Sequence, residues 1–323
     1  MNASARAIAG VRDLVKIFKV RGDKGGAPLQ LHAVNQVGFD ISAGETLGLV
    51  GESGSGKSTI GRLLVGLIPP TRGHIELFGE SISGKDGARH LANVRSRLQF
   101  VFQDPYGSLN PRMRVADCIA EPLDIAGDVS RRERADRIVE LLEIVGLPRS
   151  CGDRYPHEFS GGQRQRIGIA RALALRPEFI VCDEPVSALD VSMQAQIVNL
   201  LLDLQEKFGL SYLFIAHDLA VVRSIARRVA VMYAGSIVEQ GPKGVIYRTP
   251  KHPYTQALLD AVPRPDPERQ RKPVLSGEIP SILNALPGCA FAMRCSLATD
   301  RCRVERPMPR EIDAGHLVAC HLA

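Results

Sequence analysis

Short apolar runs along the chain predict a few buried strands. Residues 46–50 (TLGLV), residues 179–182 (FIVC) and the stretch YLFIA before His217 are almost continuously apolar. Such runs are typical of parallel strands that are covered on both faces. In SRRERADRIVELLEIVGL, Leu, Ile and Val instead recur at helical spacing, which predicts an amphipathic helix. Together these elements are typical of an α/β fold.

Prolines mark the expected ends of elements. The helix after residues 51–58 is predicted to run to about Ile68, because Pro69 and Pro70 follow it. From residue 246 onward the sequence is proline-rich and predicts irregular structure, and PRPDPERQRKP in particular predicts a linker or loop. We find no internal repeat.

Length and composition narrow the class of protein. The 323 residues are enough for one large domain with an appendage or for two domains, and 45% apolar and 24% charged residues are ordinary for a globular protein. The sequence shows neither a membrane-spanning run nor the apolar core of a signal peptide. We therefore expect a cytoplasmic location and reduced thiols. The net charge of +6 is scattered and indicates a solvated surface.

The strand at 46–50 leads into a glycine-rich loop. Residues 51–58 (GESGSGKS) match the phosphate-binding pattern G-x-x-x-x-G-K-S. Its glycines let backbone N–H groups turn toward a phosphate, and the following helix adds the positive end of its dipole. Lys57 would contact the β- and γ-phosphates, and the Ser58 hydroxyl would bind Mg²⁺. The predicted nucleotide-binding residues here are Gly51, Ser53, Gly54, Ser55, Gly56, Lys57, Ser58 and Thr59.

Two adjacent carboxylates follow the strand at 179–182. Ligands of open α/β sheets bind at the carboxyl ends of the strands. There Asp183 would hold Mg²⁺, and Glu184 would orient and polarise the water that attacks the γ-phosphate. Two carboxylates after a strand could instead cap the next helix, but the phosphate loop favours the catalytic interpretation.

The segment FSGGQRQRIGIARAL, residues 159–173, separates this chain from other phosphate-loop proteins. Here the sequence resembles the ATP-binding cassette (ABC) ATPases, whose signature S-G-G-Q precedes a helix. A hydroxyl and backbone amides at a helix N-terminus suit a γ-phosphate. The resemblance implies that two cassettes enclose two ATP molecules, each signature facing the nucleotide of the other subunit. The matching residues are Ser160, Gly161, Gly162 and Gln163.

The same resemblance implies roles for residues outside these motifs. Gln103 matches the glutamine that contacts Mg²⁺ and water, and His217 matches the histidine that contacts the γ-phosphate. Asp190 matches the aspartate at the dimer seam. Phe18 matches the aromatic that stacks on adenine, although an aromatic there would also suit a core. The implied catalytic residues are Lys57, Gln103, Glu184 and His217, and the implied Mg²⁺ ligands are Ser58, Gln103 and Asp183.

The resemblance also implies an architecture. An ABC-type core would combine a parallel sheet, flanking helices and an N-terminal antiparallel β-layer. Residues 1–262 are the predicted ATP-binding domain, with an inserted helical subdomain at about 103–169. Residues 263–323 are the predicted C-terminal extension, which contains cysteines.

A narrower resemblance is carried by FQDPYGSLNPRM, YRTPKHPYTQALLDAVP and PGCAFAMRC. These segments are similar to ATPase subunits of bacterial dipeptide/oligopeptide importers, most of all to the second of the two ATPases that such importers usually contain. The resemblance implies ATP-driven import of peptides or related small solutes, at the cytoplasmic face of the inner membrane. Implied partners are a second ABC ATPase subunit, two permease subunits and an extracytoplasmic substrate-binding protein, and no nucleic acid.

A soluble ABC-superfamily ATPase that acts on nucleic acid or the ribosome is the alternative. The short spacing between Lys57 and Ser160 leaves no room for the long coiled-coil arms of chromosome-maintenance relatives. Translation factors of the superfamily usually carry two cassettes, whereas this chain has one. Both observations favour transport.

Four of the seven cysteines lie near the C-terminal end: Cys289, Cys295, Cys302 and Cys320. Four thiolates could hold zinc or a [4Fe–4S] cluster. Zinc sites usually contain a closely spaced cysteine pair, which is missing here, so the spacing favours iron–sulfur. Some members of the resembled importer group carry such a cluster at the matching cysteines. Four reduced thiols that pack a small domain remain an alternative, as does zinc.

Overall fold

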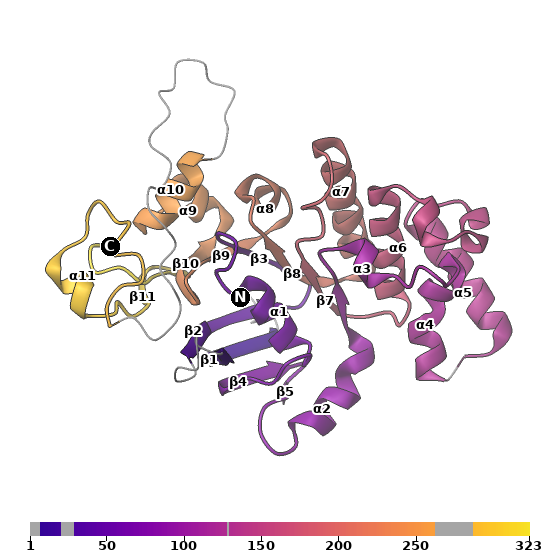
Figure 1. The fold of residues 1–323 in the computed structure, drawn as a ribbon, viewed down its shortest axis with the longest axis horizontal. Coiled ribbons are helices and arrows are strands. Elements are labelled where there is room, and N and C mark those ends of the chain that lie inside the picture. The colour runs from indigo at the N-terminus through magenta and orange to yellow at the C-terminus, as the bar shows by residue number, and fades with distance from the viewer. Residues whose placement is uncertain (1–6, 21–28, 128, 262–286) are drawn as a thin grey trace, which may run out of the picture.

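The computed structural model describes residues 7–20, 29–127, 129–261 and 287–323, and in them the strands form two sheets (Figure 1). The smaller sheet is antiparallel and has the strand order β2-β1-β4-β5. It is the N-terminal β-layer that the sequence predicts. Its strands are β1 (Ala7–Val20), β2 (Leu29–Ser42), β4 (Arg72–Leu77) and β5 (Glu80–Ser81).

The larger sheet has the order β11-β12-β10-β9-β3-β8-β7-β6. Its strands from β9 to β6 run parallel, and β10, β12 and β11 extend it in antiparallel fashion. The three apolar runs form β3, β7 and β8 at its centre, where every residue is buried, as predicted. The strands are β3 (Thr46–Val50), β6 (Leu98–Val101), β7 (Phe179–Asp183), β8 (Ser211–Ala216), β9 (Arg228–Tyr233), β10 (Ser236–Pro242), β11 (Arg310–Asp313) and β12 (His316–Val318).

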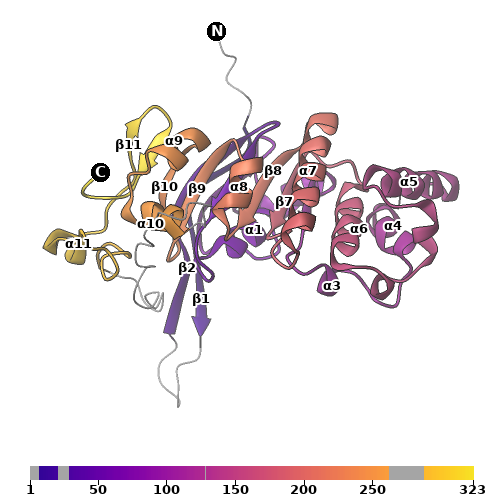
Figure 2. The same ribbon diagram turned by 90° about the horizontal axis from the view of Figure 1, so that it is seen from above.

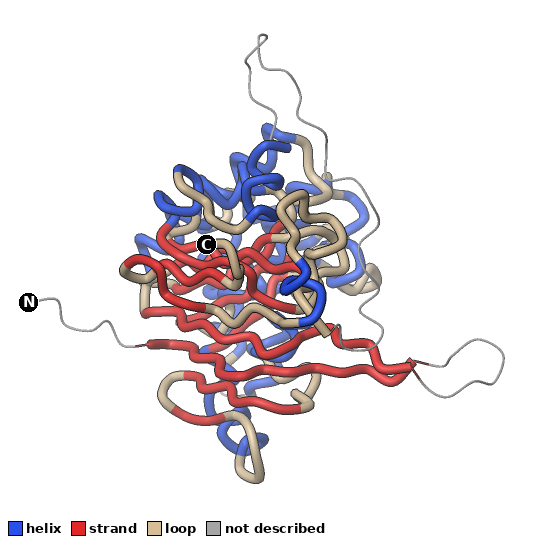
Figure 3. The backbone as a smooth tube through the Cα atoms, turned by 90° about the vertical axis from the view of Figure 1, so that its left-hand side faces the viewer, coloured by secondary structure: helices blue, strands red, loops and turns tan. Residues whose placement is uncertain are grey.

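Helix α1 (Lys57–Leu64) lies between the two sheets. Its residues Ile60 and Leu63 are buried among apolar side chains of both sheets, including Phe39 of β2 and Ile215 of β8. Helices α7 (Val191–Phe208) and α8 (Leu219–Ile225) cover the other face of the large sheet, as Figure 2 shows. In the view of Figure 3 the strands form one continuous block, with helices gathered around it.

A group of helices projects from one end of the large sheet (Figure 2). The predicted amphipathic helix is present as α5, and the capping box of Ser130 and Glu133 fixes its start. The helices between β5 and β7 are α2 (Gly87–Val94), α3 (Pro105–Ser108), α4 (Val115–Ala126), α5 (Arg131–Ile144) and α6 (Gly161–Leu173). Short 3₁₀ turns are η2 (Arg95–Arg97), η3 (Arg149–Asp153) and η4 (Pro156–Glu158).

Two predictions about helices were wrong. Helix α1 ends at Leu64 rather than near Ile68, because Gly66 adopts a left-handed conformation (φ 71°) before the two prolines are reached. The chain after residue 246 is also not uniformly irregular. It contains α10 (Pro253–Ala261), which begins with a proline, and a proline suits a first helical turn. The other helices here are α9 (Lys243–Arg248) and α11 (Asp300–Val304).

The predicted linker PRPDPERQRKP lies outside the described residues. In the described ranges, none of the helices is both long and apolar enough to cross a membrane.

Candidate functional site

The phosphate loop connects β3 to α1, and its backbone has room only for glycine at two positions. Gly51 (φ 154°) and Gly56 (φ 103°) have positive φ angles. A Cβ atom on Gly51 would lie 2.1 Å from the carbonyl oxygen of Met232, and one on Gly56 would lie 2.1 Å from that of Ala33. The loop is therefore packed tightly against its neighbours, which fixes the start of α1.

Lys57, the first residue of α1, is buried and points back into the loop. Its Nζ donates hydrogen bonds to the carbonyl oxygens of Gly51 (2.8 Å) and Glu52 (2.9 Å) and to Oγ of Ser55 (3.3 Å). Burial lowers the pKa of Lys57, and the carboxylate of Glu184 opposes that shift. Gly51 and Ser55 thus act in this structure by holding the lysine.

Ser58 joins the loop to the end of β7. Its hydroxyl donates a hydrogen bond of 2.8 Å to Oδ1 of Asp183. Burial raises the pKa of Asp183, and the bond from Ser58 counteracts part of that effect. A hydroxyl and a carboxylate this close together provide the oxygen ligands that Mg²⁺ prefers, so the residues fit the ion.

Glu184 follows Asp183 in the sequence, and two side chains contact its carboxylate. Nε2 of Gln103 donates to Oε2 of Glu184 at 2.9 Å, and Nδ1 of His217 lies 3.3 Å from the same oxygen. The Glu184 backbone is held in the left-handed region (φ 45°), and its N–H donates to the carbonyl of Ile215. This uncommon conformation turns the carboxylate away from the strand toward Gln103 and His217.

These groups share one cavity of about 780 Å³. Phe18 and Leu31, which face each other in the β1–β2 pair, form one wall, and Glu184 and His217 lie at another. The predicted residues that line the cavity are Phe18, Ser53, Gly54, Gly56, Lys57, Ser58, Thr59, Gln103, Glu184 and His217. The structure therefore brings together the phosphate loop, the expected adenine contact and the three expected catalytic side chains outside the loop.

The remaining predicted contacts lie elsewhere. Of the described residues that line this cavity, none belongs to the S-G-G-Q segment. Ser160 caps α6, and its Oγ accepts a hydrogen bond from the N–H of Gln163 (3.3 Å). Asp190 caps α7 through the N–H of Met193 (2.9 Å). Gly161 and Gly162 occupy the first turn of α6. Within one chain these residues cap helices and do not contact the cavity.

Comparison with known proteins identifies the family. A family model described as "ABC transporter" matches residues 34–187, and one described as "Oligopeptide/dipeptide transporter, C-terminal region" matches residues 238–302. A Brucella abortus protein, provisionally named a peptide import ATP-binding protein, is 60% identical over 310 residues, which are 96% of this chain and 92% of the relative. This chain belongs to the ABC transporter ATP-binding proteins. A Brucella ovis protein of the same name is 50% identical, with 97% of both chains covered.

Solved structures agree with the ABC assignment. A dimeric ATP-binding cassette bound to ADP and phosphate is 30% identical and has a TM-score of 0.64, covering 73% of this chain and 98% of that cassette. The protein cbiO1 of Clostridium perfringens, part of the ABC transporter complex cbiONQ, is 26% identical with a TM-score of 0.63, covering 75% of this chain and 91% of cbiO1. The ABC-type fold predicted from the signature is thereby confirmed.

Some cavity residues of this ABC protein were not predicted. Leu31 and Ala33 reach the cavity because β2 pairs with β1, and the register of that pair contains irregularities that the sequence does not reveal. The others are Asp104, Ser187 and Ala188, which adjoin predicted motifs and could have been found by extending them.

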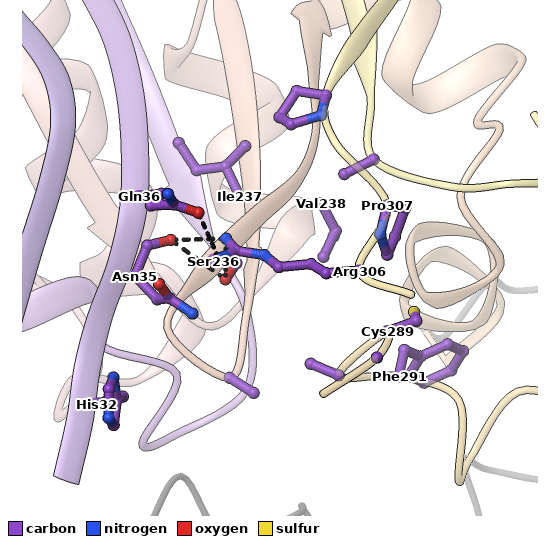
Figure 4. Close-up of a pocket in the computed structure, with 15 residues that line it drawn as sticks. His32, Asn35, Gln36, Ser236, Ile237, Val238, Cys289, Phe291, Arg306 and Pro307 are labelled. Atoms are coloured by element: carbon purple, nitrogen blue, oxygen red, sulfur yellow. Dashed lines mark hydrogen bonds between the residues drawn. The ribbon is translucent and has the colours of Figure 1, made fainter. Parts of the chain in front are cut away.

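The described C-terminal segment, residues 287–323, docks on the rest of the chain in part through Arg306. The Arg306 guanidinium donates to Oε1 of Gln36 (2.7 Å), to the carbonyl of Asn35 (2.9 Å) and to Oγ of Ser236 (3.2 Å), as Figure 4 shows. Strands β11 and β12 add to the large sheet beside β10. The C-terminal segment is thus part of the main structure.

The four C-terminal cysteines come near one another. The N–H of Cys289 donates to the carbonyl of Cys302 (2.8 Å). Burial raises the pKa of Cys289, and the charges of Cys302, Cys320 and Cys295 raise it further. Across the described ranges, however, no three His, Cys, Asp or Glu side chains are arranged to hold a metal ion. The structure therefore gives no metal site in the described part of the C-terminal segment.

Proposed function

We propose that this chain is the ATP-hydrolysing subunit of an ABC transporter that imports peptides. The observation that carries the proposal is the shared cavity of about 780 Å³, which Lys57, Glu184 and His217 line together. The names of the Brucella relatives and the C-terminal family match support peptides as the imported class.

The geometry supports attack of a water molecule on the γ-phosphate. Lys57 and the loop amides stabilise negative charge on the β- and γ-phosphates. Glu184 accepts a hydrogen bond from the attacking water and directs it in line with the γ-phosphate, while Gln103 and His217 hold the carboxylate at 2.9 and 3.3 Å. Mg²⁺, held by Ser58, Asp183 and Gln103, would neutralise phosphate oxygens. Phe18 contacts the adenine.

We infer that two cassettes form the complete site. Ser160, Gly161, Gly162, Gln163 and Asp190 lie outside the cavity of their own chain, so only another subunit can bring such residues to the nucleotide. The solved relative that is a dimer supports this arrangement. The proposed second cassette is a different ATPase, and this chain takes the place of the second ATPase of the importer.

The remaining partners follow from the import function. We propose two permease subunits and an extracytoplasmic binding protein, with this chain at the cytoplasmic face of the inner membrane. A second cavity of about 770 Å³ supports a permease contact. It lies between Gln103 and α4, and the exposed side chains of Phe102 and Ile125 (39% and 81%) give it apolar edges for a short helix.

The [4Fe–4S] cluster remains a proposal for Cys289, Cys295, Cys302 and Cys320. Its support is the backbone hydrogen bond of 2.8 Å between Cys289 and Cys302 and the electrostatic effect of Cys295, Cys302 and Cys320 on the thiol of Cys289, although the described side chains are not arranged to hold a metal ion. A cluster would hold the C-terminal segment in place of a large hydrophobic core. Anaerobic purification followed by iron and sulfide analysis tests it: a colourless, iron-free protein with an ordered segment would end the proposal.

The transport function is tested by reconstitution. The chain, two permease subunits and an ATPase partner from the same importer are placed in liposomes, with ATP and Mg²⁺ on the cassette side and labelled peptide plus binding protein on the other. We expect ATP-dependent peptide uptake that is lost when Lys57 is replaced by alanine. Hydrolysis without uptake of any peptide would contradict the import function.

A further inference from the structure

Glu52, the second residue of the phosphate loop, connects the C-terminal segment to the catalytic lysine. Nη1 and Nη2 of Arg294 donate to its two carboxylate oxygens at 2.7 and 3.0 Å. The N–H of Glu52 donates to Oη of Tyr254 (2.9 Å), and its carbonyl accepts from Nζ of Lys57 (2.9 Å). Its side chain, N–H and carbonyl are thus each bound by a different residue.

The ion pair is shielded from water. The side chain of Arg294 is 4% exposed and that of Glu52 is 24% exposed, whereas the similar pair Arg301–Glu305 is 61% and 53% exposed. Two-pronged arginine–carboxylate pairs of low exposure hold geometry far better than surface pairs do. The hydrogen bonds that Arg294 donates to the Glu52 carboxylate raise the pKa of Arg294 above its ordinary value, so the guanidinium stays charged.

Aromatic packing sets the position of Arg294. Phe291, three residues earlier, is buried against Tyr233 with the rings edge to face (5.2 Å between centroids) and against Tyr254 (5.5 Å). Arg294 also donates to Oη of Tyr233 at 3.4 Å. Tyr254 belongs to α10 and Tyr233 to β9, so the C-terminal segment reaches the loop through a cluster of packed aromatic rings. This local packing fixes Arg294 next to Glu52.

We propose that Arg294 is a positioning residue for ATP binding, which acts through Glu52 on the loop that holds Lys57. The inference rests on the proposed function, since it takes ATP to be the ligand of the loop. If Arg294 is removed, the Glu52 carboxylate loses both hydrogen bonds in a poorly hydrated place and moves toward water. The carbonyl that orients Lys57 moves with it.

The test measures the dissociation constant of a fluorescent ATP analogue, with Mg²⁺, for the full-length chain. We expect Arg294→Gln to weaken binding about tenfold, within the usual range for coupling between sites. Arg306→Gln is the matched control, because Arg306 anchors the same segment to the body at Asn35 and Ser236, outside the phosphate loop. We expect that control to lower the melting temperature but leave the dissociation constant within about twofold.

A second variant distinguishes a positioning role of Arg294 from a general loss of stability. Glu52→Gln should weaken binding by a similar factor, and the double variant should be no weaker than either single variant, because both changes break the same link. Unchanged affinity in folded Arg294→Gln, an equal loss in Arg306→Gln, or additive losses in the double variant would each overturn the inference. Failure of the unmodified chain to bind the analogue would instead overturn the proposed function.

Discussion

Gln103 and Glu184 are joined by a hydrogen bond of 2.9 Å between the amide Nε2 and the carboxylate Oε2, although they follow different strands of the large sheet. Gln103 follows β6 and Glu184 follows β7, which are parallel neighbours. The relationship matters because Gln103 also borders the cavity beside α4, where we propose that the permease docks. A movement of the permease would thus reach the catalytic carboxylate through a single side chain.

His217→Ala tests the other contact of Glu184. Loss of the imidazole, 3.3 Å from Oε2, leaves the carboxylate and the γ-phosphate less well placed. We expect the turnover of the assembled transporter to fall about 100-fold, as for loss of one positioned catalytic group, with ATP affinity almost unchanged. Steady-state hydrolysis measures this, and His90→Ala is the control because His90 lies in α2, does not line the nucleotide cavity and contacts the carbonyl of Ser81. Equal rates in the two variants would remove His217 from the mechanism.

Gly56→Ala tests the fit of the phosphate loop. The new methyl group would meet the Ala33 carbonyl at 2.1 Å in addition to the strain of a positive φ angle, so the loop must shift. Gly44→Ala is the matched control for Gly56→Ala. Gly44 also has a positive φ angle (71°), but no other atom lies within 4 Å of the added carbon. Both variants should lose about 1–2 kcal/mol of stability from backbone strain. Only Gly56→Ala should lose ATP binding in a fluorescence titration.

Ser160→Arg tests the two-cassette site. Bulk and charge at the N-cap of α6 would block approach of a second nucleotide-loaded cassette. Ser130→Arg is the control, because Ser130 caps α5 with the same capping box, so both variants should lose about 1 kcal/mol from the lost cap. We expect transport-coupled hydrolysis to disappear only in Ser160→Arg. A fully active, strictly monomeric protein would contradict the two-cassette proposal.

His252 should make stability fall in mild acid. Burial lowers its pKa from 6.5 to about 4, and its Nδ1 accepts the N–H of Tyr254. Between pH 6.5 and 4 the unfolded chain binds a proton that the folded chain does not, so folding loses about 2 kcal/mol between pH 7 and pH 5 from this group. The nearby contact of 2.8 Å between Nε2 of His316 and Oε1 of Glu239 is present in both proteins compared below.

The matched variant is His252→Asn, whose side-chain oxygen can still accept the Tyr254 N–H. Denaturant unfolding at pH 7 and pH 5 gives the free energy of unfolding for both proteins. We expect the variant to lose about 2 kcal/mol less than the natural chain over this interval. An equal loss in both would show that His252 does not contribute to acid sensitivity.

The sequence predicted the parts of the site that are built from residues adjacent along the chain. The loop from Gly51 to Ser58 and the carboxylates after β7 follow short patterns whose geometry is fixed by adjacent elements, so both could be predicted. Phe18 could be placed in the cavity only by resemblance, because its approach depends on how the smaller sheet packs over α1.

Contacts between distant segments could not be predicted. Glu52 and Arg294 are 242 positions apart, and neither residue type alone indicates a partner. The proline-based prediction after residue 246 failed for a related reason. Pro253 opens α10 because Tyr254 and Leu259 are buried against the body, and the sequence pattern does not show this tertiary packing.

The most direct test of the account is ATP hydrolysis by the assembled transporter with Glu184→Gln. The amide keeps the size of the side chain but cannot polarise the attacking water as a carboxylate does, so hydrolysis should fall at least about 100-fold while ATP and Mg²⁺ still bind. We expect the variant to accumulate as a closed pair of cassettes with ATP trapped between them. Hydrolysis close to that of the natural chain would contradict the assignment of Glu184 and the mechanism built on it.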